Sequence, residues 1–105
     1  MTLDEALEKT DCRTTMVEHP TVVWLSERFE EFEKNSMAVS HIVMGTDAEK
    51  VLVEEWETMI SFNGGRLLWG AKLSVRDDLK DGFWLVSLEN HDERWSAKRY
   101  KVSEV

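Results

Sequence analysis

The spacing of apolar residues in the first third of the chain predicts two helices. The first ends near residue 9 and begins with the capping box Thr2-Leu3-Asp4-Glu5, a pattern that satisfies free backbone N–H groups of the first turn. Residues 11–20 are expected to be irregular or to hold a brief strand at 14–17. The second helix is expected over residues 21–35, where apolar residues recur every three to four positions as Val22, Leu25, Phe29 and Phe32.

A continuous apolar segment in the middle of the chain predicts a buried strand followed by a third helix. Residues 38–44 read Ala-Val-Ser-His-Ile-Val-Met, which is too apolar for a surface loop and too short for a helix. We therefore expect an inner strand that is covered on both faces. Thr46 and Glu49 form a second capping box, which predicts a helix over 47–60. Its inward stripe consists of Ala48, Leu52, Trp56 and Met59.

From residue 66 the apolar period changes to two, which is typical of strands. Residues 66–76 are predicted to form one strand, one face of which consists of Leu67, Trp69, Ala71, Leu73 and Val75. A polar turn at 77–82 leads to a partner strand over 83–88, and a turn at 90–93 leads to a last strand over 95–102. Basic residues on that last strand are typical of a protected sheet edge, and they are Lys98, Arg99 and Lys101.

Together these segments predict a single α+β domain over residues 1–105. The sheet is expected to be small, mixed or antiparallel, with two to three helices packed on one face. Its four strands are expected at Ala38–Met44, Arg66–Arg76, Phe83–Leu88 and Trp95–Val102. Hydrophobic residues make up 42% of the chain and include five Trp and four Phe, which suffices for one modest core without disulfides.

The distribution of charge narrows the class of partner. The net charge is −8, but residues 1–62 hold 14 acidic against 5 basic residues, while residues 63–105 hold 7 against 8. Because phosphate binding depends on cationic side chains, the acidic part argues against direct nucleic-acid binding. It suits a basic surface on a protein partner, or it is simply a pair of solvated helix faces. No apolar run approaches the ~18 residues of a membrane span, so no membrane association is expected.

No pattern in the sequence indicates catalysis, a cofactor or a metal. The three histidines, His19, His41 and His91, lie in separate segments without the spacing of a zinc site. Cys12 is the single cysteine, which suits a reducing compartment, and its thiol is expected to be unreactive because only Arg13 is a cationic neighbour. Gly-rich phosphate loops and the Gly-x-Ser-x-Gly motif are missing from the sequence. We therefore expect a protein that is not an enzyme.

Aromatic and acidic side chains are the candidate contact residues. Trp56 and Trp69 lie on predicted inward stripes and are expected in the core. Trp24 lies off the apolar stripe of its helix, and Trp84 and Trp95 lie on strands near polar residues. Aromatic anchors of this kind are enriched at protein interfaces; alternatively, these three residues complete the core. The candidate partner-binding set is Trp24, Glu27, Glu30, Glu31, Glu54, Glu55, Trp84 and Trp95.

Residues 41–88 carry a resemblance to a known family. His41-Ile42-Val43-Met44 precede a helix that starts near residue 47. A Gly64-Gly65 bend, the segment Leu68-Trp69-Gly70-Ala71-Lys72-Leu73-Ser74-Val75, an acidic turn at 77–78 and Gly82-Phe83-Trp84-Leu85-Val86 follow. This order resembles the strand–helix–hairpin of the axial domain in HK97-type phage coat proteins and encapsulins. Coat subunits are far longer, so the resemblance implies a reduced relative or a small virion protein.

Two functions follow as expectations. The resemblance implies a non-enzymatic, phage-type structural or assembly protein that contacts other virion subunits or further copies of itself, in the virion or the host cytoplasm. The charge distribution suggests an alternative, a small acidic inhibitor that mimics nucleic acid and blocks a nuclease or another nucleic-acid-binding enzyme. In both, the acidic helix faces and exposed aromatics would carry recognition.

Overall fold

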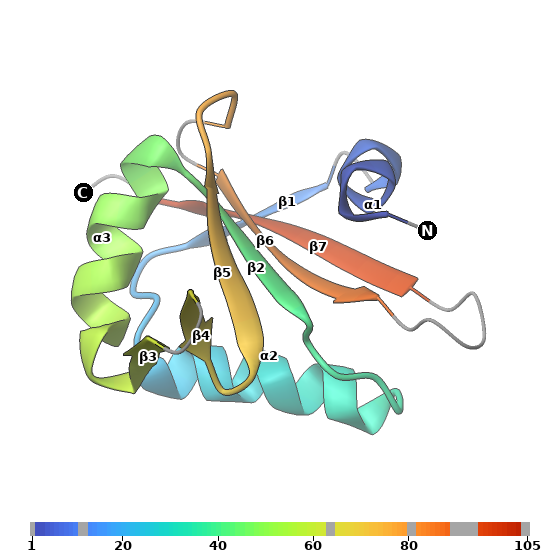
Figure 1. The fold of residues 1–105 in the computed structure, drawn as a ribbon, viewed down its shortest axis with the longest axis horizontal. Coiled ribbons are helices and arrows are strands. Elements are labelled where there is room, and N and C mark those ends of the chain that lie inside the picture. The colour runs from blue at the N-terminus through green and yellow to red at the C-terminus, as the bar shows by residue number, and fades with distance from the viewer. Residues whose placement is uncertain (1, 11–12, 63–64, 80–81, 89–94, 104–105) are drawn as a thin grey trace.

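A computed structural model describes residues 2–10, 13–62, 65–79, 82–88 and 95–103. Three α-helices and seven strands form this part of the chain, and the last five strands follow one another without a helix between them (Figure 1). In chain order they are α1 (Leu3–Lys9), β1 (Thr14–Val17), α2 (Val22–Lys34), β2 (His41–Gly45), α3 (Thr46–Trp56), the 3₁₀ turn η1 (Glu57–Met59), β3 (Ile60–Phe62), β4 (Arg66–Leu68), β5 (Ala71–Arg76), β6 (Gly82–Leu88) and β7 (Trp95–Val102).

The α+β class is confirmed, but the four-stranded sheet is wrong. The strands form one seven-stranded mixed sheet in the order β1-β7-β6-β2-β5-β4-β3. The β1–β7 and β2–β5 pairs are parallel, and the other four pairs are antiparallel. The expectation that 83–88 pairs with the preceding strand is wrong, because β2 lies between β5 and β6. The three further strands, β1, β3 and β4, have only three or four residues each, too few to show a period of two. A brief strand at 14–17 was one of two alternatives, β4 lies inside the segment expected as one strand, and β3 was not expected. As a result β7 is an inner strand rather than an edge, and β1 and β3 are the edges.

A tight hairpin divides the segment that was expected to be one strand over 66–76. Leu68 pairs with Ala71, so Trp69 and Gly70 are the two central residues of the turn between β4 and β5. Their φ angles are +50° and +84°. Two positive φ values are what a two-residue hairpin of type I′ requires, and glycine supplies the second one without strain. The hairpin therefore removes Trp69 from the inward face and leaves it 44% exposed.

The helices cover both faces of the sheet, which corrects the expectation that they pack on one. Alternate residues of the central strand β2 point to opposite sides, and Ile42, Val43 and Met44 are all fully buried. Ile42 and Met44 join the larger core beneath α2 and α3. Val43 instead packs with Ala6 of α1 on the opposite face. Figure 1 shows α1 apart from α2 and α3, across the sheet.

Threonine caps two of the three helices, and one of the two predicted capping residues, Thr2, is confirmed. The hydroxyl oxygens of Thr2 and Thr21 each accept a hydrogen bond of 3.2 Å, from the backbone N–H of Glu5 and of Trp24. The predicted cap at Thr46 is wrong, because Gly45 is the N-cap of α3 and Thr46 is its first residue. The helix also ends at Trp56 rather than near residue 60, and the following η1 turn leaves Met59 39% exposed.

Candidate functional site

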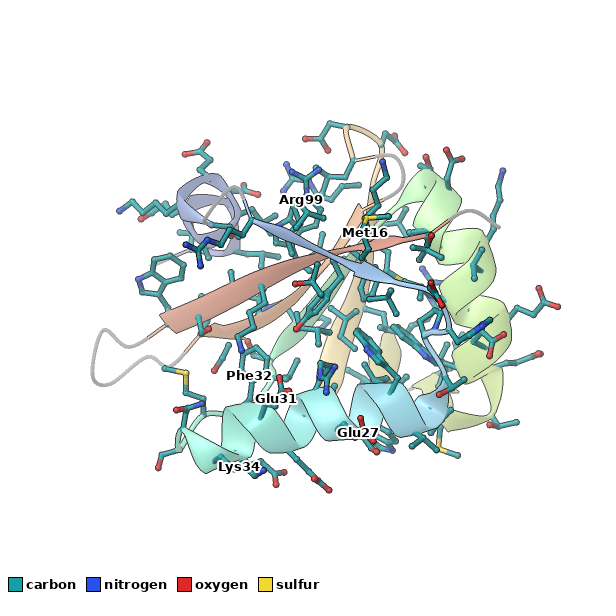
Figure 2. The ribbon with its side chains drawn as sticks, turned by 180° about the vertical axis from the view of Figure 1, so that it is seen from behind. Met16, Glu27, Glu31, Phe32, Lys34 and Arg99 are labelled. Carbon is teal, nitrogen blue, oxygen red and sulfur yellow. The ribbon has the colours of Figure 1, made fainter. Side chains whose placement is uncertain are left out.

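Acidic side chains gather on the outer sides of α2 and α3 (Figure 2). Because the apolar stripes of both helices face the sheet, their acidic residues have only the solvent side left. We call the exposed carboxylates of α2, α3 and η1 the acidic helical surface; it consists of Glu27, Glu30, Glu33, Asp47, Glu54, Glu55 and Glu57. The basic residues of the same elements are Arg28, Lys34 and Lys50. This surface is the strongest candidate contact region of the described residues.

A buried hydrogen bond fixes α2 and α3 relative to one another. The indole Nε1 of Trp56, the last residue of α3, donates to the carbonyl oxygen of Pro20 at 2.7 Å. Pro20 lies two residues before α2, and both groups are buried. The start of α2 is therefore tied to the end of α3, so the carboxylates on the two helices keep a fixed arrangement.

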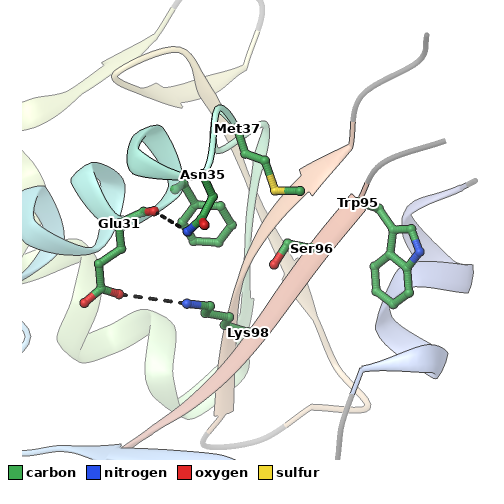
Figure 3. A pocket seen from close by; sticks show the side chains of 7 residues that line it. Glu31, Asn35, Met37, Trp95, Ser96 and Lys98 are labelled. Carbon is green, nitrogen blue, oxygen red and sulfur yellow. Dashed lines mark hydrogen bonds and ion pairs between the residues drawn. The ribbon is translucent and has the colours of Figure 1, made fainter. Parts of the chain in front are cut away.

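A pocket of about 290 Å³ lies between the C-terminal half of α2 and β7 (Figure 3). Its lining residues are Glu31, Phe32, Asn35, Met37, Trp95, Ser96 and Lys98. The Glu31 carboxylate lies 3.9 Å from the Lys98 ammonium and 3.1 Å from the Arg28 guanidinium. Lys98 also lies 5.6 Å from the centre of the Phe32 ring, a cation–π contact. Glu31 is thus largely neutralised by neighbours and differs from the solvated acids of α2.

Burial and charge beside this pocket shift the pKa of Tyr100. Burial of the phenol, reinforced by the Glu31 carboxylate and partly offset by Arg28, raises the pKa of Tyr100 to about 12. Both causes keep the phenol neutral at ordinary pH, because a phenolate there would be poorly solvated and would face a like charge. Tyr100 therefore serves packing: its ring stacks on Phe83 at 5.4 Å and meets the Trp24 ring edge-on at 5.2 Å.

The predicted contact residues divide into exposed and packed ones. Glu27, Glu30, Glu54 and Glu55 are exposed, as a contact role requires. Trp24 is half-buried against the core, and the Arg28 guanidinium lies 5.4 Å from its ring. Trp95 is half-buried and packs with the cluster beneath α1, and Figure 3 shows its side chain turned away from Glu31. The structure brings Glu31 and Trp95 to one pocket but places Glu54 and Glu55 on another helix.

Trp84 is not a surface anchor, which corrects the expectation for this residue. Its side chain is 5% exposed and packs with Val43, Val86 and Ala6 beneath α1. The Arg99 guanidinium covers its ring at 5.0 Å. The expectation failed because it assumed one solvated face of the sheet, whereas α1 covers the centre of that face.

Trp69 is the exposed aromatic residue that sequence reasoning assigned to the core. Its ring meets Phe29 of α2 edge-on, with centroids 5.1 Å apart and planes at 85°. With Ser26, Glu30 and Glu33 these two residues line a further pocket of about 320 Å³. The available signal was the Trp69-Gly70 pair, since a glycine inside a strand pattern often marks a turn or bulge.

Neither the remaining side-chain groups of the described residues nor a comparison with known proteins indicates a function. Among the described residues, no group of three or more His, Cys, Asp or Glu side chains is placed to hold a metal ion. His41 begins β2, where its Nδ1 lies 2.8 Å from the Ser40 hydroxyl; Cys12 and His91 lie outside the described residues. Within the ranges described, no helix has the length and apolar character needed to cross a bilayer. No protein-family model, curated protein or solved structure matches the chain.

Proposed function

We propose that this protein is not an enzyme and acts by docking its acidic helical surface onto a basic surface of a partner protein. The observation that carries the proposal is the set of seven exposed carboxylates on α2, α3 and η1. Among the described residues, Glu27 alone of this set lies within ion-pair distance of a cation, 3.6 Å from Arg28. Unneutralised charge of one sign steers association with the opposite sign and fixes the orientation of the complex.

A phage-type particle is the first kind of partner that this proposal includes. Its support is the resemblance of residues 41–88 to the strand–helix–hairpin of the axial domain of phage coat proteins. The elements β2, α3, β5 and β6 occur in that order along the chain, but β5 and β6 both pair with β2 and not with each other, so the hairpin of the resemblance is not formed. In this form the protein is a structural or assembly component that contacts other virion subunits or copies of itself. It would act in the virion or in the host cytoplasm.

A nucleic-acid-binding enzyme is the second kind of partner, and the geometry of α2 favours it. Glu27, Glu30 and Glu33 follow one another at three-residue intervals, and side chains so spaced on a helix lie about 5–6 Å apart. A row of regularly spaced carboxylates on a helix resembles the charge pattern of a phosphate backbone, and a basic cleft on an enzyme would bind it for the same reason. In this form the protein is an inhibitor that competes with nucleic acid.

Charge reversal with a matched control tests the shared proposal. The tagged protein is used to capture partners from cells of its source, beside two triple variants that each add the same charge. The surface variant is Glu27→Lys, Glu54→Lys and Glu55→Lys; the control is Glu8→Lys, Glu18→Lys and Asp77→Lys, all at exposed positions. We expect the surface variant to lose a partner that the control keeps, and salt to release that partner from the wild type. Equal capture by both variants would contradict the proposal.

The captured partner then separates the two forms. A particle component sediments with the protein in a large assembly, whereas an inhibited enzyme forms a small complex that nucleic acid competes away. For the inhibitor form, added nucleic acid should weaken binding in proportion to its length and charge. Co-sedimentation that is insensitive to nucleic acid supports the assembly form.

A further inference from the structure

A pocket on the side of α2 opposite the Glu31 pocket combines aromatic walls with carboxylates. It holds about 320 Å³ and is lined by Ser26, Phe29, Glu30, Glu33 and Trp69. On a helix with 3.6 residues per turn, Phe29, Glu30 and Glu33 lie roughly opposite Glu31 and Asn35, which line the other pocket. The hairpin between β4 and β5 supplies the remaining wall through Trp69.

The chemistry of this pocket suits a flat cation. The rings of Phe29 and Trp69 stand nearly perpendicular with centroids 5.1 Å apart, and both residues line the pocket. Trp69 remains 44% exposed, and Glu30 and Glu33 are both exposed beside it. Of the two basic residues of α2, Arg28 is directed to Glu27 and Glu31, and Lys34 forms no ion pair with the described residues. A cation from outside would meet a π face and two carboxylates at once.

The backbone at Trp69 shows that this side chain is held in place against a conformational cost. Its φ of +50° is one that residues other than Gly, Asn and Asp rarely adopt. An Asn-Gly pair is the preferred sequence for this turn, so a tryptophan at position 69 is not explained by the turn itself. What the tryptophan provides is the ring against Phe29 and the exposed indole surface above Glu30 and Glu33.

We propose that the pocket of Phe29, Trp69, Glu30 and Glu33 receives the guanidinium of an arginine side chain on a basic partner. This inference rests on the proposed function and names the anchor point of the acidic helical surface. A guanidinium is planar, stacks on aromatic rings and donates two parallel hydrogen bonds to one carboxylate. An ammonium forms neither the stack nor the paired bonds, so arginine is the preferred occupant over lysine.

Short peptides test the pocket without a known partner. The probes are acetyl-Gly-Arg-Gly-amide and the same peptide with lysine or with neutral citrulline in place of arginine, titrated into the ¹⁵N-labelled protein. With the arginine peptide we expect saturable changes in the chemical shift of the Trp69 indole N–H. The lysine peptide is expected to bind at least fivefold more weakly, and the citrulline peptide is expected not to bind. Equal binding of the lysine peptide would overturn the preference for a guanidinium. Binding of the neutral citrulline peptide would overturn the claim that the occupant must be a cation.

Three variants locate the binding. Trp69→Asn keeps the turn, because asparagine tolerates positive φ. This variant is expected to bind the arginine peptide at least tenfold more weakly. Glu30→Gln with Glu33→Gln removes the carboxylates and is expected to weaken it at least fivefold. Glu54→Gln with Glu55→Gln removes the same charge elsewhere on the acidic helical surface and is expected to change it less than twofold. Equal losses from the two glutamine pairs would show general charge attraction and overturn the pocket.

The outcomes also separate this inference from the proposed function. If Trp69→Asn retains a partner that the Glu27, Glu54 and Glu55 reversal loses, the acidic surface docks but the pocket is not its anchor. If the peptide binds the pocket and no partner depends on the acidic helical surface, the pocket is real and the proposed function fails. Native-like ¹H–¹⁵N spectra of each variant confirm that loss of binding is not loss of folding.

Discussion

Replacing Trp56 by phenylalanine tests how the two acidic helices are held together. The substitution removes the indole N–H that donates to the Pro20 carbonyl at 2.7 Å. A phenyl ring retains most of the contact with Phe83, whose ring centre lies 6.1 Å away. Since both Trp56 and Pro20 are buried, water cannot readily replace the lost donor. The change therefore isolates a polar link inside an apolar core.

Two effects determine how much Trp56→Phe lowers the free energy of unfolding. A buried carbonyl left without its donor costs about 1–3 kcal/mol. The smaller ring leaves about 40 Å³ unfilled, which at ~24 cal/mol per Å³ adds about 1 kcal/mol. The expected loss in the free energy of unfolding is therefore about 2–4 kcal/mol. For a chain of this length, this corresponds to a fall in Tm of roughly 10–20 °C.

Urea unfolding followed by circular dichroism measures this loss, with Trp69→Phe as the matched control. The control makes the same chemical change at a residue that is 44% exposed and is expected to cost less than about 1 kcal/mol. A loss below about 1 kcal/mol for Trp56→Phe would refute the reasoning, because it would mean that the Pro20 carbonyl finds another donor at no cost. An equal loss for both variants would attribute the effect to ring size alone.

Two further predictions follow from single residues. Tyr100 is the one tyrosine of the chain, so the alkaline rise in tyrosinate absorbance should have its midpoint at about 12 in the folded protein; a midpoint near 10 would contradict its burial. Because the folded state holds this proton more tightly, its contribution to stability is complete below about pH 10 and is lost as the pH rises toward 12. Gly70→Ala should lower the free energy of unfolding, as measured by urea denaturation, by about 1–2 kcal/mol. The cause is backbone strain at φ +84° and not a steric clash, because an added Cβ meets no atom within 4 Å.

The helices and the long strands could be predicted because each carries a period over many residues. The α2 stripe extends from Val22 to Phe32, and residues 42–44 are continuously apolar and lie in the central strand. The strands β3 and β4 could not be recognised in this way. Their three residues each show no period, and they are stabilised by pairing through the hairpin with β5, which is a tertiary property.

The candidate surface was predictable in part for the same reason. Glutamates on an amphipathic helix must face solvent once the apolar stripe is buried, so Glu27, Glu30, Glu54 and Glu55 could be placed from the sequence alone. Which flank of α2 carries a pocket depends on what packs beside it. On one flank that neighbour is β7, and on the other it is the β4–β5 hairpin. Neither neighbour adjoins α2 in the sequence.

Trp84 was expected at the surface and is buried, whereas Trp69 was expected in the core and is exposed. The reason for this exchange indicates which tryptophan is suited to contact a partner. On an isolated strand, alternate residues mark two faces but do not tell which face is covered. Trp84 is buried because α1, the helix nearest the N-terminus, covers the second face of β6. Trp69 is exposed because Gly70 permits a turn that ends the alternation two residues after Leu67. An aromatic residue that stays exposed on a rigid turn, beside carboxylates on a packed helix, keeps its ring ordered before any partner arrives. Binding at such a residue costs little side-chain entropy, so the hairpin tip is a better anchor than the buried Trp84 of β6.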